Sequence, residues 1–425
     1  MAFLAFALFP AAAGAVLYID INAPGGKRLP LAVGDFVVVS GSPALTRGIP
    51  KMLEADLELT QLFDLVPQEA QLEKVVSAHF AGKNLDFPAW KTVGAEAVVI
   101  GKVEGRGDQL AIEMRVYDAT QGTLIIGKRY SGTPAQVPQI VHRFANEIVY
   151  VFTGVRGVFG TEIAFSARDG RGKEIYVVGM DGKGLRKVTG NRSFNLFPRW
   201  SPDGRWLAFT SFRTGVPVIY LHNPETGVEK EVVRAGDTKA PGGFSPDGDW
   251  LYYSASAGGN SDIHRVRVVG GAREKVAGGW GLEVSPTVSP DGRRIAFASD
   301  RAGAPQIYVK DLGSGEERRI SQPGVYATSP CWSPAGDRIA FTARAGGRFA
   351  IYTVGPDGND LRPVASLSDA DCEDPSFSPD GRQLVYSLRK KGYSALKITS
   401  LDGRRERTLV SGLGDVGSPA WSPAR

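Results

Sequence analysis

The second half of the chain repeats one five-residue phrase at an almost constant interval. The intervals between the first residues of successive copies are 44, 44, 44, 45 and 44. A repeat of about 40–45 residues is typical of a β-propeller, in which each unit forms one four-stranded blade. The copies read WSPDG at 200–204, FSPDG at 244–248, VSPDG at 288–292, WSPAG at 332–336, FSPDG at 377–381 and WSPAR at 421–425.

The phrase itself has the chemistry of a tight turn. Proline at its third position fixes φ, aspartate closes a local turn with its side chain, and glycine accepts positive φ. We therefore expect each phrase to join an innermost strand to the next strand outward, with the preceding Trp, Phe or Val packed between blades. These roles are structural, and none of them is catalytic.

The two ends of the repeat region are incomplete in complementary ways. The first unit, 161–190, begins directly at its second strand, and the last phrase, Trp421–Arg425, has no second strand after it. The simplest solution is that Ser418–Trp421 supplies the innermost strand of the first blade. Because closure removes open sheet edges, the sequence predicts a six-bladed, all-β propeller over 157–425 that is closed by the C-terminal strand.

The residues before the repeats predict a small α/β domain over 16–155. Strands are expected at 16–21, 31–40, 97–104, 109–118 and 124–130, and helices at about 42–62, 68–80 and 134–152. The chain begins with an apolar run, 1–15, that ends in small residues, Ala13-Gly14-Ala15. This pattern indicates a signal peptide and export, although no Lys or Arg precedes Lys27.

Composition excludes several classes of function. The formal net charge of +5 comes from 50 basic and 45 acidic residues of interspersed sign, so we expect no nucleic-acid partner. No later segment is long and apolar enough to insert into a membrane. Cys331 and Cys372 are the two cysteines, which cannot make a metal site on their own, and whether they pair stays open. We expect a monomer.

No residue pattern points to catalysis or to a cofactor. The chain lacks a nucleophile elbow, a P-loop and a zinc-binding helix motif. His264 stands where other units have tyrosine and is interpreted as structural, and His142 is expected on the surface of its helix. The sequence therefore predicts a protein that is not an enzyme and holds no metal.

Function on a repeat scaffold usually lies in variable loops. The loops that lead into the innermost strands cluster at one end of the propeller channel, and they vary in size and charge while the phrase does not. The predicted binding residues at this channel mouth are Asn195, Leu196, Phe197, Thr238, Lys239, Ala240, Val284, Ser285, Thr328, Ser329, Glu373, Asp374, Gly417 and Ser418.

The whole layout resembles the TolB family of secreted periplasmic proteins. The resemblance covers about 16–425 and rests on the N-terminal domain together with the repeats and the unfinished last phrase. The matching segments are VLYID at 16–20, RLPLAV at 28–33, AVVIGKV at 97–103, the recurring WSPDG phrases and PAWSP at 419–423.

This resemblance implies a periplasmic protein-interaction scaffold of the Tol-Pal system, which supports outer-membrane integrity and cell division. In the family, the peptidoglycan-associated lipoprotein Pal docks over the channel mouth, and the mature N-terminal segment contacts the inner-membrane protein TolA. Here that second site corresponds to Val16, Leu17, Tyr18, Ile19, Asp20, Ile21 and Asn22.

Two other readings remain open on the residues alone. A glycan- or metal-binding propeller of the lyase type requires several histidines that converge on the channel, and the propeller has only His222 and His264, both in outer-strand positions. A generic periplasmic scaffold with other partners is the third possibility.

Overall fold

A computed structural model describes residues 28–42, 44, 47–234, 236–322 and 326–424. Contacts divide the chain into one unit that ends at Gly157 and a second that begins at Val158. The predicted signal peptide, 1–15, the predicted strand 16–21 and the predicted TolA-contacting segment all lie outside the described residues.

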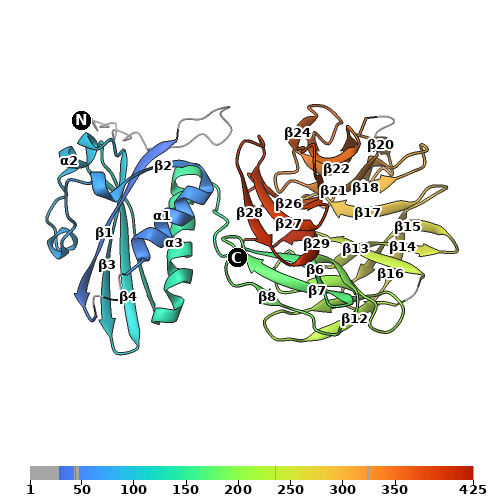
Figure 1. The fold of residues 1–425 in the computed structure, drawn as a ribbon, viewed down its shortest axis with the longest axis horizontal. Helices are drawn as coiled ribbons and strands as arrows, with labels where there is room; N and C mark the ends of the chain where they lie inside the picture. Colours follow the sequence, from blue (N-terminus) through green and yellow to red (C-terminus); the bar gives the residue numbers. More distant parts are fainter. Residues whose placement is uncertain (1–27, 43, 45–46, 235, 323–325, 425) are drawn as a thin grey trace, which may run out of the picture. The chain divides into compact units, whose positions relative to one another are not determined.

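The first unit is a five-stranded mixed sheet with helices packed against it. The spatial order is β2-β1-β3-β4-β5; β1 runs parallel to β2 and β3, and β3, β4 and β5 are antiparallel. Figure 1 shows α1 and α3 side by side along the sheet. The elements are β1 (Leu29–Ser40), α1 (Ile49–Thr60), β2 (Phe63–Val66), the 3-10 turns η2 (Gln68–Ala70) and η3 (Ser77–Phe80), α2 (Phe87–Thr92), β3 (Ala97–Arg106), β4 (Gln109–Asp118), β5 (Thr123–Gly132), η4 (Pro134–Gln136) and α3 (Val137–Thr153).

Alternation of apolar residues explains how this sheet buries one face. Along β4, every second residue from Leu110 to Val116 is buried, and the residues between them are partly exposed. Helix α3 carries a continuous buried stripe that includes Phe144, Ile148 and Phe152. Both patterns confirm the predicted strand and helix, because side chains with a period of 2 or 3.6 residues gather on one face.

The prediction of a helix at 68–80 is wrong. Only the short turns η2 and η3 form there, and extended chain lies between them. The Glu73 carboxylate accepts hydrogen bonds from the indole Nε1 of Trp90 at 2.7 Å and from the backbone N–H of Asp86 at 3.0 Å. These hydrogen bonds to residues outside the segment stabilise the extended chain between η2 and η3. Strand β2 and helix α2 were not predicted, and α1 begins about seven residues later than predicted.

The second unit contains six four-stranded antiparallel sheets, which are the six predicted blades. The first strand of each blade contacts the first strands of its two neighbours in a closed cycle, so these six strands line the propeller axis. From the inside outward, blade 1 contains β29 (Gly414–Trp421), β6 (Glu162–Asp169), β7 (Gly172–Gly179) and β8 (Arg186–Lys187); blade 2 contains β9 (Asn195–Trp200), β10 (Leu207–Ser211), β11 (Val218–His222) and β12 (Glu229–Val233); blade 3 contains β13 (Thr238–Phe244), β14 (Trp250–Ala257), β15 (Asn260–Arg267) and β16 (Arg273–Ala277); blade 4 contains β17 (Glu283–Val288), β18 (Arg294–Ser299), β19 (Gln306–Asp311) and β20 (Glu317–Arg319); blade 5 contains β21 (Ala327–Trp332), β22 (Ile339–Ala345), β23 (Arg348–Val354) and β24 (Arg362–Ala365); and blade 6 contains β25 (Asp371–Phe377), β26 (Gln383–Lys390), β27 (Tyr393–Ser400) and β28 (Glu406–Ser411).

Blade 1 joins the two ends of the propeller region, as the incomplete repeats predict. Strand β29 pairs with β6 in antiparallel register, with Trp421 opposite Ile163, and Figure 1 shows the two strands side by side. The indole Nε1 of Trp421 donates to Thr161 Oγ1 at 2.8 Å, and the backbone N–H of Ser422 donates to the carbonyl of Glu162 at 2.8 Å. The ring is therefore closed by hydrogen bonds between residues about 260 positions apart.

The first five phrases form the predicted turn at the end of an innermost strand. In the first copy, Ser201 Oγ donates to Asp203 Oδ1 at 2.5 Å, the backbone N–H of Trp206 donates to Ser201 Oγ at 2.9 Å, and Gly204 has φ 67°. The fourth copy, WSPAG, lacks the aspartate, and there Ser333 Oγ donates to Asp337 Oδ1 at 2.7 Å instead. A carboxylate two residues later thus replaces the missing one.

The large residue that begins a phrase packs between blades, as Trp332 shows. Trp332 lies in one buried cluster with Ile307 of blade 4 and Phe341 of blade 5. In blades 1, 2, 4 and 5 the second and third strands stack an aromatic pair, such as Phe297 on Tyr308 with ring centroids 6.1 Å apart. In blade 3, His264 takes the tyrosine position and stacks on Tyr253 at 5.6 Å, where burial lowers the pKa of its imidazole. This is the structural role that we expected for His264.

Candidate binding face at the channel mouth

The direction of the innermost strands defines two different ends of the channel. Each innermost strand runs toward its phrase, so the loops that lead into these strands lie at the opposite end. The turns that join the second strand of each blade to the third lie at that same end, because the strands are antiparallel. We call this end, made of the loops into the innermost strands and the second-to-third-strand turns, the mouth face.

A recurring bulge shapes the channel just inside the mouth face. All six innermost strands show a break in register with their neighbour near the middle of the strand. At this position five of the six carry a non-glycine residue with positive φ, between 50° and 58°. Such a conformation costs about 1–3 kcal/mol at each position and persists only where the surroundings enforce it. The five residues are Phe197, Ser285, Ser329, Asp374 and Ser418.

Side chains at the bulges of three successive blades meet one another. Ser329 Oγ donates to Asp374 Oδ1 at 2.8 Å, and the backbone N–H of Ser418 donates to Asp374 Oδ2 at 3.2 Å. The backbone N–H of Asp374 in turn donates to Thr342 Oγ1 at 3.0 Å. The structure therefore brings these predicted site residues together around one carboxylate on the channel wall.

The predicted mouth residues divide into accessible and buried sets. Phe197 and Thr238 are exposed, whereas Asn195, Lys239 and Gly417 are buried. The three buried residues therefore cannot contact a partner directly. The half-buried members of the set are Leu196, Ala240, Val284, Ser285, Thr328, Ser329, Glu373, Asp374 and Ser418.

The buried polar members support the loops from within. Asn195 Nδ2 donates to Glu174 Oε2 at 2.8 Å and to the carbonyl of Lys173 at 3.1 Å, which ties blade 2 to blade 1. Lys239 Nζ donates to the carbonyl oxygens of Pro217, at 2.8 Å, and of Gly236, and burial lowers the pKa of this amine. Hydrogen bonds of this kind satisfy buried polar groups, so both residues position loops.

The most pronounced property of the mouth face is its exposed aromatic residues, which were not predicted from the sequence. Of the twelve exposed large apolar side chains that the structure describes in the propeller, nine lie on this face and three at the phrase end. All six aromatics among them are at the mouth, and Trp280 is fully exposed. The nine are Phe194, Phe197, Phe212, Val216, Trp280, Leu282, Tyr326, Leu367 and Tyr393; the three at the other end are Leu185, Val228 and Val269.

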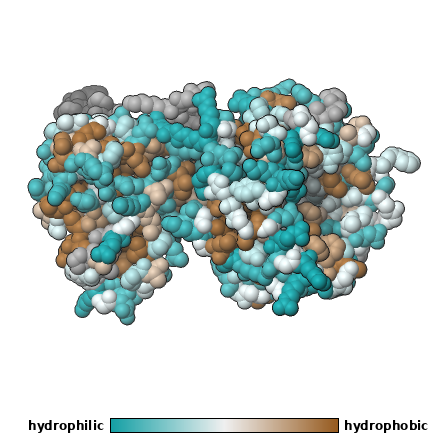
Figure 2. All heavy atoms as spheres, in the orientation of Figure 1, coloured by the Kyte–Doolittle hydropathy of each residue, from teal (hydrophilic) through white to brown (hydrophobic). Residues whose placement is uncertain are grey.

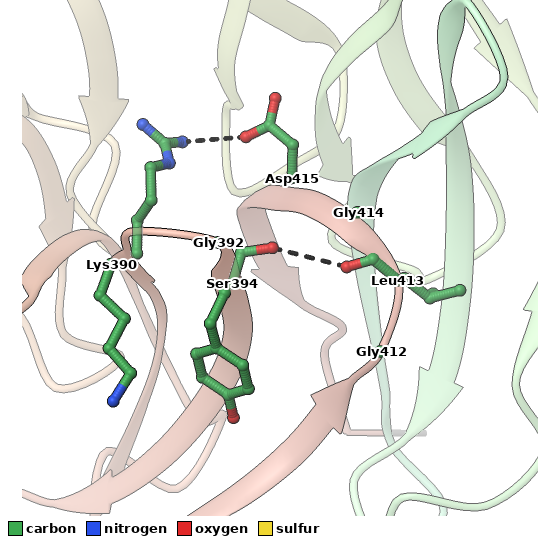
Figure 3. A pocket seen from close by; sticks show the side chains of 9 residues that line it. Lys390, Gly392, Ser394, Gly412, Leu413, Gly414 and Asp415 are labelled. Carbon is green, nitrogen blue, oxygen red and sulfur yellow. Dashed lines mark hydrogen bonds and ion pairs between the residues drawn. The ribbon is translucent and has the colours of Figure 1, made fainter.

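One pocket of about 340 Å³ opens on the mouth face, between the β26–β27 turn and the loop before β29. The Arg389 guanidinium lies 3.5 Å from Asp415 Oδ1 at this pocket. Figure 3 shows the Ser394 hydroxyl near the carbonyl of Leu413. Arg389 also pairs with Glu373, at 3.3 Å, and burial raises the pKa of that carboxyl. The pocket is lined by two cationic side chains, Arg389 and Lys390, and one carboxylate, Asp415.

The histidines and cysteines do not form a chemical site in the described part of the chain. No group of three or more His, Cys, Asp or Glu side chains is placed to hold a metal ion there. His142 is half-buried and its Nδ1 lies 2.7 Å from Asp56 Oδ2, which corrects its predicted surface position. Cys331 and Cys372 are both free thiols, and burial raises the pKa of Cys372 to about 12.

The face of the molecule drawn in Figure 2 is chemically mixed. Figure 2 shows polar and apolar side chains interspersed over the face that it displays. None of the helices in the described ranges combines the length and the apolar character that crossing a membrane requires.

Comparison with known proteins identifies relatives for both units. The sequence profile of the TolB amino-terminal domain matches residues 17–125, and that of the TolB beta propeller domain matches residues 150–425. The Tol-Pal system protein TolB of Syntrophus aciditrophicus is 38% identical over 229 residues, which covers 51% of this chain and 50% of the relative. The protein of the same name from Desulfosudis oleivorans is 35% identical over 234 residues, covering 53% of each. The chain thus spans about half the length of these curated relatives.

A solved structure matches almost the whole chain. The crystal structure of TolB from Acinetobacter baumannii superposes with a TM-score of 0.81 at 26% sequence identity, covering 96% of this chain and 100% of that one. Its agreement includes the N-terminal unit as well as the propeller, since coverage extends over both. The propeller profile alone spans more than half of the residues, and the chain therefore belongs to the TolB family.

Proposed function

We propose that this protein is a periplasmic component of the Tol-Pal system that works by binding other proteins and catalyses no reaction. The names of its relatives support this proposal. So does the character of the mouth face, which concentrates exposed aromatic side chains.

The observation that carries the proposal is the unequal distribution of aromatic residues between the two ends of the propeller. Tryptophan and tyrosine are enriched in protein interfaces and in the few residues that contribute most of the binding energy. An exposed apolar side chain contributes favourable free energy when a partner removes it from water. The mouth face is thus the surface best suited to a protein partner, and a Pal-like lipoprotein is the partner that we propose for it.

The second proposed contact is with a TolA-like inner-membrane protein through residues 16–22, which lie outside the described part of the chain. This element rests on the family resemblance alone. It is separable by experiment, because deletion of residues 16–22 should abolish TolA binding and leave Pal binding intact. Loss of both interactions would contradict separate sites.

Calorimetric titration with the Pal homologue of the same organism tests the mouth. We expect Trp280→Ala to weaken binding by about 30-fold, since truncation of a central tryptophan typically costs about 2 kcal/mol or more. Val269→Ala, at the opposite end, serves as the matched control and should change the affinity less than twofold.

Two results would reject the proposal. One is no measurable binding of Pal to the wild-type protein, together with binding of a glycan, which would favour a carbohydrate-binding propeller. The other is equal weakening by Trp280→Ala and Val269→Ala, which would show that the mouth is not the contact surface.

A further inference from the structure

The pocket of about 340 Å³ on the mouth face lies between two walls that come from blades 6 and 1. One wall is the end of β26 with the turn into β27, and the other is the loop that leads into β29. The backbone N–H of Val416 donates to Ser394 Oγ at 3.2 Å and joins the two walls. Figure 3 shows Lys390 on the first wall and Asp415 on the second. We call this cavity the blade 6–1 pocket, and the side chains that decide its chemistry are Arg389, Lys390, Tyr393 and Asp415.

The one carboxylate that lines the pocket lies among three cations. Asp415 Oδ2 is 2.8 Å from Lys173 Nζ and 3.8 Å from Arg168 Nη2. Asp415 Oδ1 is 3.5 Å from Arg389 Nη2. Burial by itself would raise the pKa of the Asp415 carboxyl, but the three cations outweigh burial and lower this pKa. Asp415 also has φ 46°, a conformation that a residue other than glycine keeps only where its surroundings enforce it. It is therefore a fixed, ionised part of the pocket.

The two cations that line the pocket keep their hydrogen-bond donors free. The side chains of Arg389 and Lys390 are 48% and 46% exposed. The Arg389 guanidinium lies 3.3 Å from Glu373, and Lys390 Nζ lies 3.6 Å from Asp369. Neither side chain makes a hydrogen bond to any residue in the described ranges, because none of these ion pairs has hydrogen-bond geometry. A guanidinium carries five N–H donors and an ammonium three, so both groups can donate to one more carboxylate.

A second arginine on the mouth face shows that free donors are not general there. The Arg301 guanidinium donates to Glu283 Oε1 and to Ser299 Oγ, both at 2.9 Å, and also to Glu317. Its donors are therefore engaged within blade 4. Arg389 differs because its contacts with carboxylates are ion pairs without hydrogen bonds.

The charges around the blade 6–1 pocket do not cancel. Three carboxylates lie within 4 Å of its cations, and burial raises the pKa of one of them, Glu373. Against these three stand five cations, since Lys391 in the β26–β27 turn is also exposed. The surplus of two positive charges attracts an acidic group. The five cations are Arg168, Lys173, Arg389, Lys390 and Lys391, and the three carboxylates are Asp369, Glu373 and Asp415.

The aromatic side of the pocket is continuous with the proposed binding face. Tyr393 lines the pocket, is 38% exposed and belongs to the nine apolar residues that distinguish the mouth. Lys390 Nζ lies 5.6 Å from the centroid of its ring, so the charged and apolar parts of the pocket adjoin. A partner that packs on Tyr393 therefore brings its neighbouring side chain among the cations.

A side chain of a docked protein suits this pocket better than a free anion. An ion pair between half-exposed groups contributes little free energy on its own, because water and salt screen it. A free anion would also lose its translational freedom, whereas a carboxylate on a docked partner shares that loss with the rest of the interface. The volume of about 340 Å³ is at the lower end of the range for ligand pockets, about 300–1,000 Å³, and accommodates a single side chain.

We propose that the blade 6–1 pocket receives an aspartate or glutamate side chain of the protein that docks on the mouth face, and that Arg389 and Lys390 select it. The inference rests on the proposed function and adds a chemical requirement to it. The partner must present an acidic residue beside an apolar one that packs on Tyr393. Arg389 and Lys390 thus determine specificity, whereas the exposed aromatic residues supply apolar contact area.

Calorimetric titration with the Pal homologue of the same organism tests the pocket. The double variant Arg389→Gln/Lys390→Gln should bind about tenfold more weakly than the wild type at about 50 mM sodium chloride. At about 500 mM the difference should shrink to less than about threefold, because salt screens half-exposed charges. Arg389→Glu should weaken binding by about 30-fold, and replacement of one acidic residue of Pal by lysine should restore about tenfold of that loss.

A matched control lies at the opposite end of the same blade. Arg404→Gln removes an arginine whose side chain is 82% accessible, and it should change the affinity for Pal less than about twofold. If the double variant does not fold, Lys390→Gln alone should still weaken binding by about threefold at low salt.

The outcomes separate this inference from the proposed function. If Trp280→Ala weakens binding but the pocket variants bind Pal as the wild type does, the inference is overturned and the proposed function stands. Failure of every acidic-to-lysine change in Pal to restore binding to Arg389→Glu would also overturn it. No binding of Pal to the wild-type protein would reject both.

Discussion

Closure of the propeller by Trp421 leads to a prediction with a definite magnitude. The side chain is 93% buried and its indole donates to Thr161 at 2.8 Å. Truncation of a buried tryptophan to alanine costs about 3–5 kcal/mol, and the lost hydrogen bond is worth about 1 kcal/mol within that range. We therefore expect Trp421→Ala to lower the free energy of unfolding of the propeller by about 4 kcal/mol.

Urea unfolding followed by tryptophan fluorescence measures this change. Six of the seven tryptophans lie in the propeller, so the signal reports mainly on that unit. With a denaturant dependence of about 3 kcal/mol per molar, the loss corresponds to a midpoint lower by about 1.3 M urea. Trp421→Phe keeps most of the packing and should cost only about 1–2 kcal/mol.

Trp280→Ala is the control, since it also removes one tryptophan but from a fully exposed position. It should change the free energy of unfolding by less than about 0.5 kcal/mol. If Trp421→Ala proved as mild as Trp280→Ala, the hydrogen-bonded closure of blade 1 by β29 would not be an important source of stability, and the reasoning would fail.

Two further predictions concern single contacts. Gly242→Ala places a Cβ 2.0 Å from the Pro286 carbonyl and should destabilise the propeller by about 2 kcal/mol or more, whereas Gly243→Ala should cost less than about 1 kcal/mol; equal melting temperatures for the pair would refute the argument. In the N-terminal unit, a hydrogen bond from Arg129, helped by one from Lys102, lowers the pKa of Glu104 to about 2. Since this value lies below that of the unfolded chain, about 4.3, the stabilisation is present above about pH 4.5 and is lost as the pH falls toward 2. The wild type should therefore lose more stability than Glu104→Gln over that range, and a carboxyl titration by NMR with a midpoint near 4.3 would contradict the pairing.

The blade number and the closure were predictable from sequence because they depend on local chemistry repeated at a fixed period. Proline, aspartate and glycine specify the turn wherever they occur, and the interval of 44 or 45 residues then counts the blades. Even the altered fourth copy keeps its turn, because Asp337 supplies the carboxylate from a nearby position. The replacement of the missing aspartate by Asp337 was not predicted, although Asp337 lies only two positions later in the sequence.

The irregular parts depend on partners that are far away in sequence. Glu73 holds its segment through Trp90 and Asp86, so the helical spacing of apolar residues at 68–80 does not produce a helix. Asn195 and Lys239 lie in the predicted loops, yet their polar groups are satisfied inside neighbouring blades. Only the folded loops reveal this burial.

The exposure of the aromatic residues at the mouth face could not be predicted from the sequence for a related reason. A tryptophan in a loop is usually expected to pack inward, and only the structure shows that Trp280 does not. A large aromatic between glycines, as in Gly279-Trp280-Gly281, is the sequence signal that could have indicated an exposed anchor.

The pairing of β29 with β6 also constrains the order of events during synthesis. Strand β6 is made early, but its hydrogen-bonding partner emerges only when residues 414–421 have been translated, about 250 residues later. Until then the inner edge of blade 1 is an unpaired strand, which is prone to join with other chains. A chain released before residue 414 would therefore contain five complete blades and a first blade whose strand β6 has an unpaired edge. Proteins that shield unpaired strands would be needed most before residues 414–421 are made.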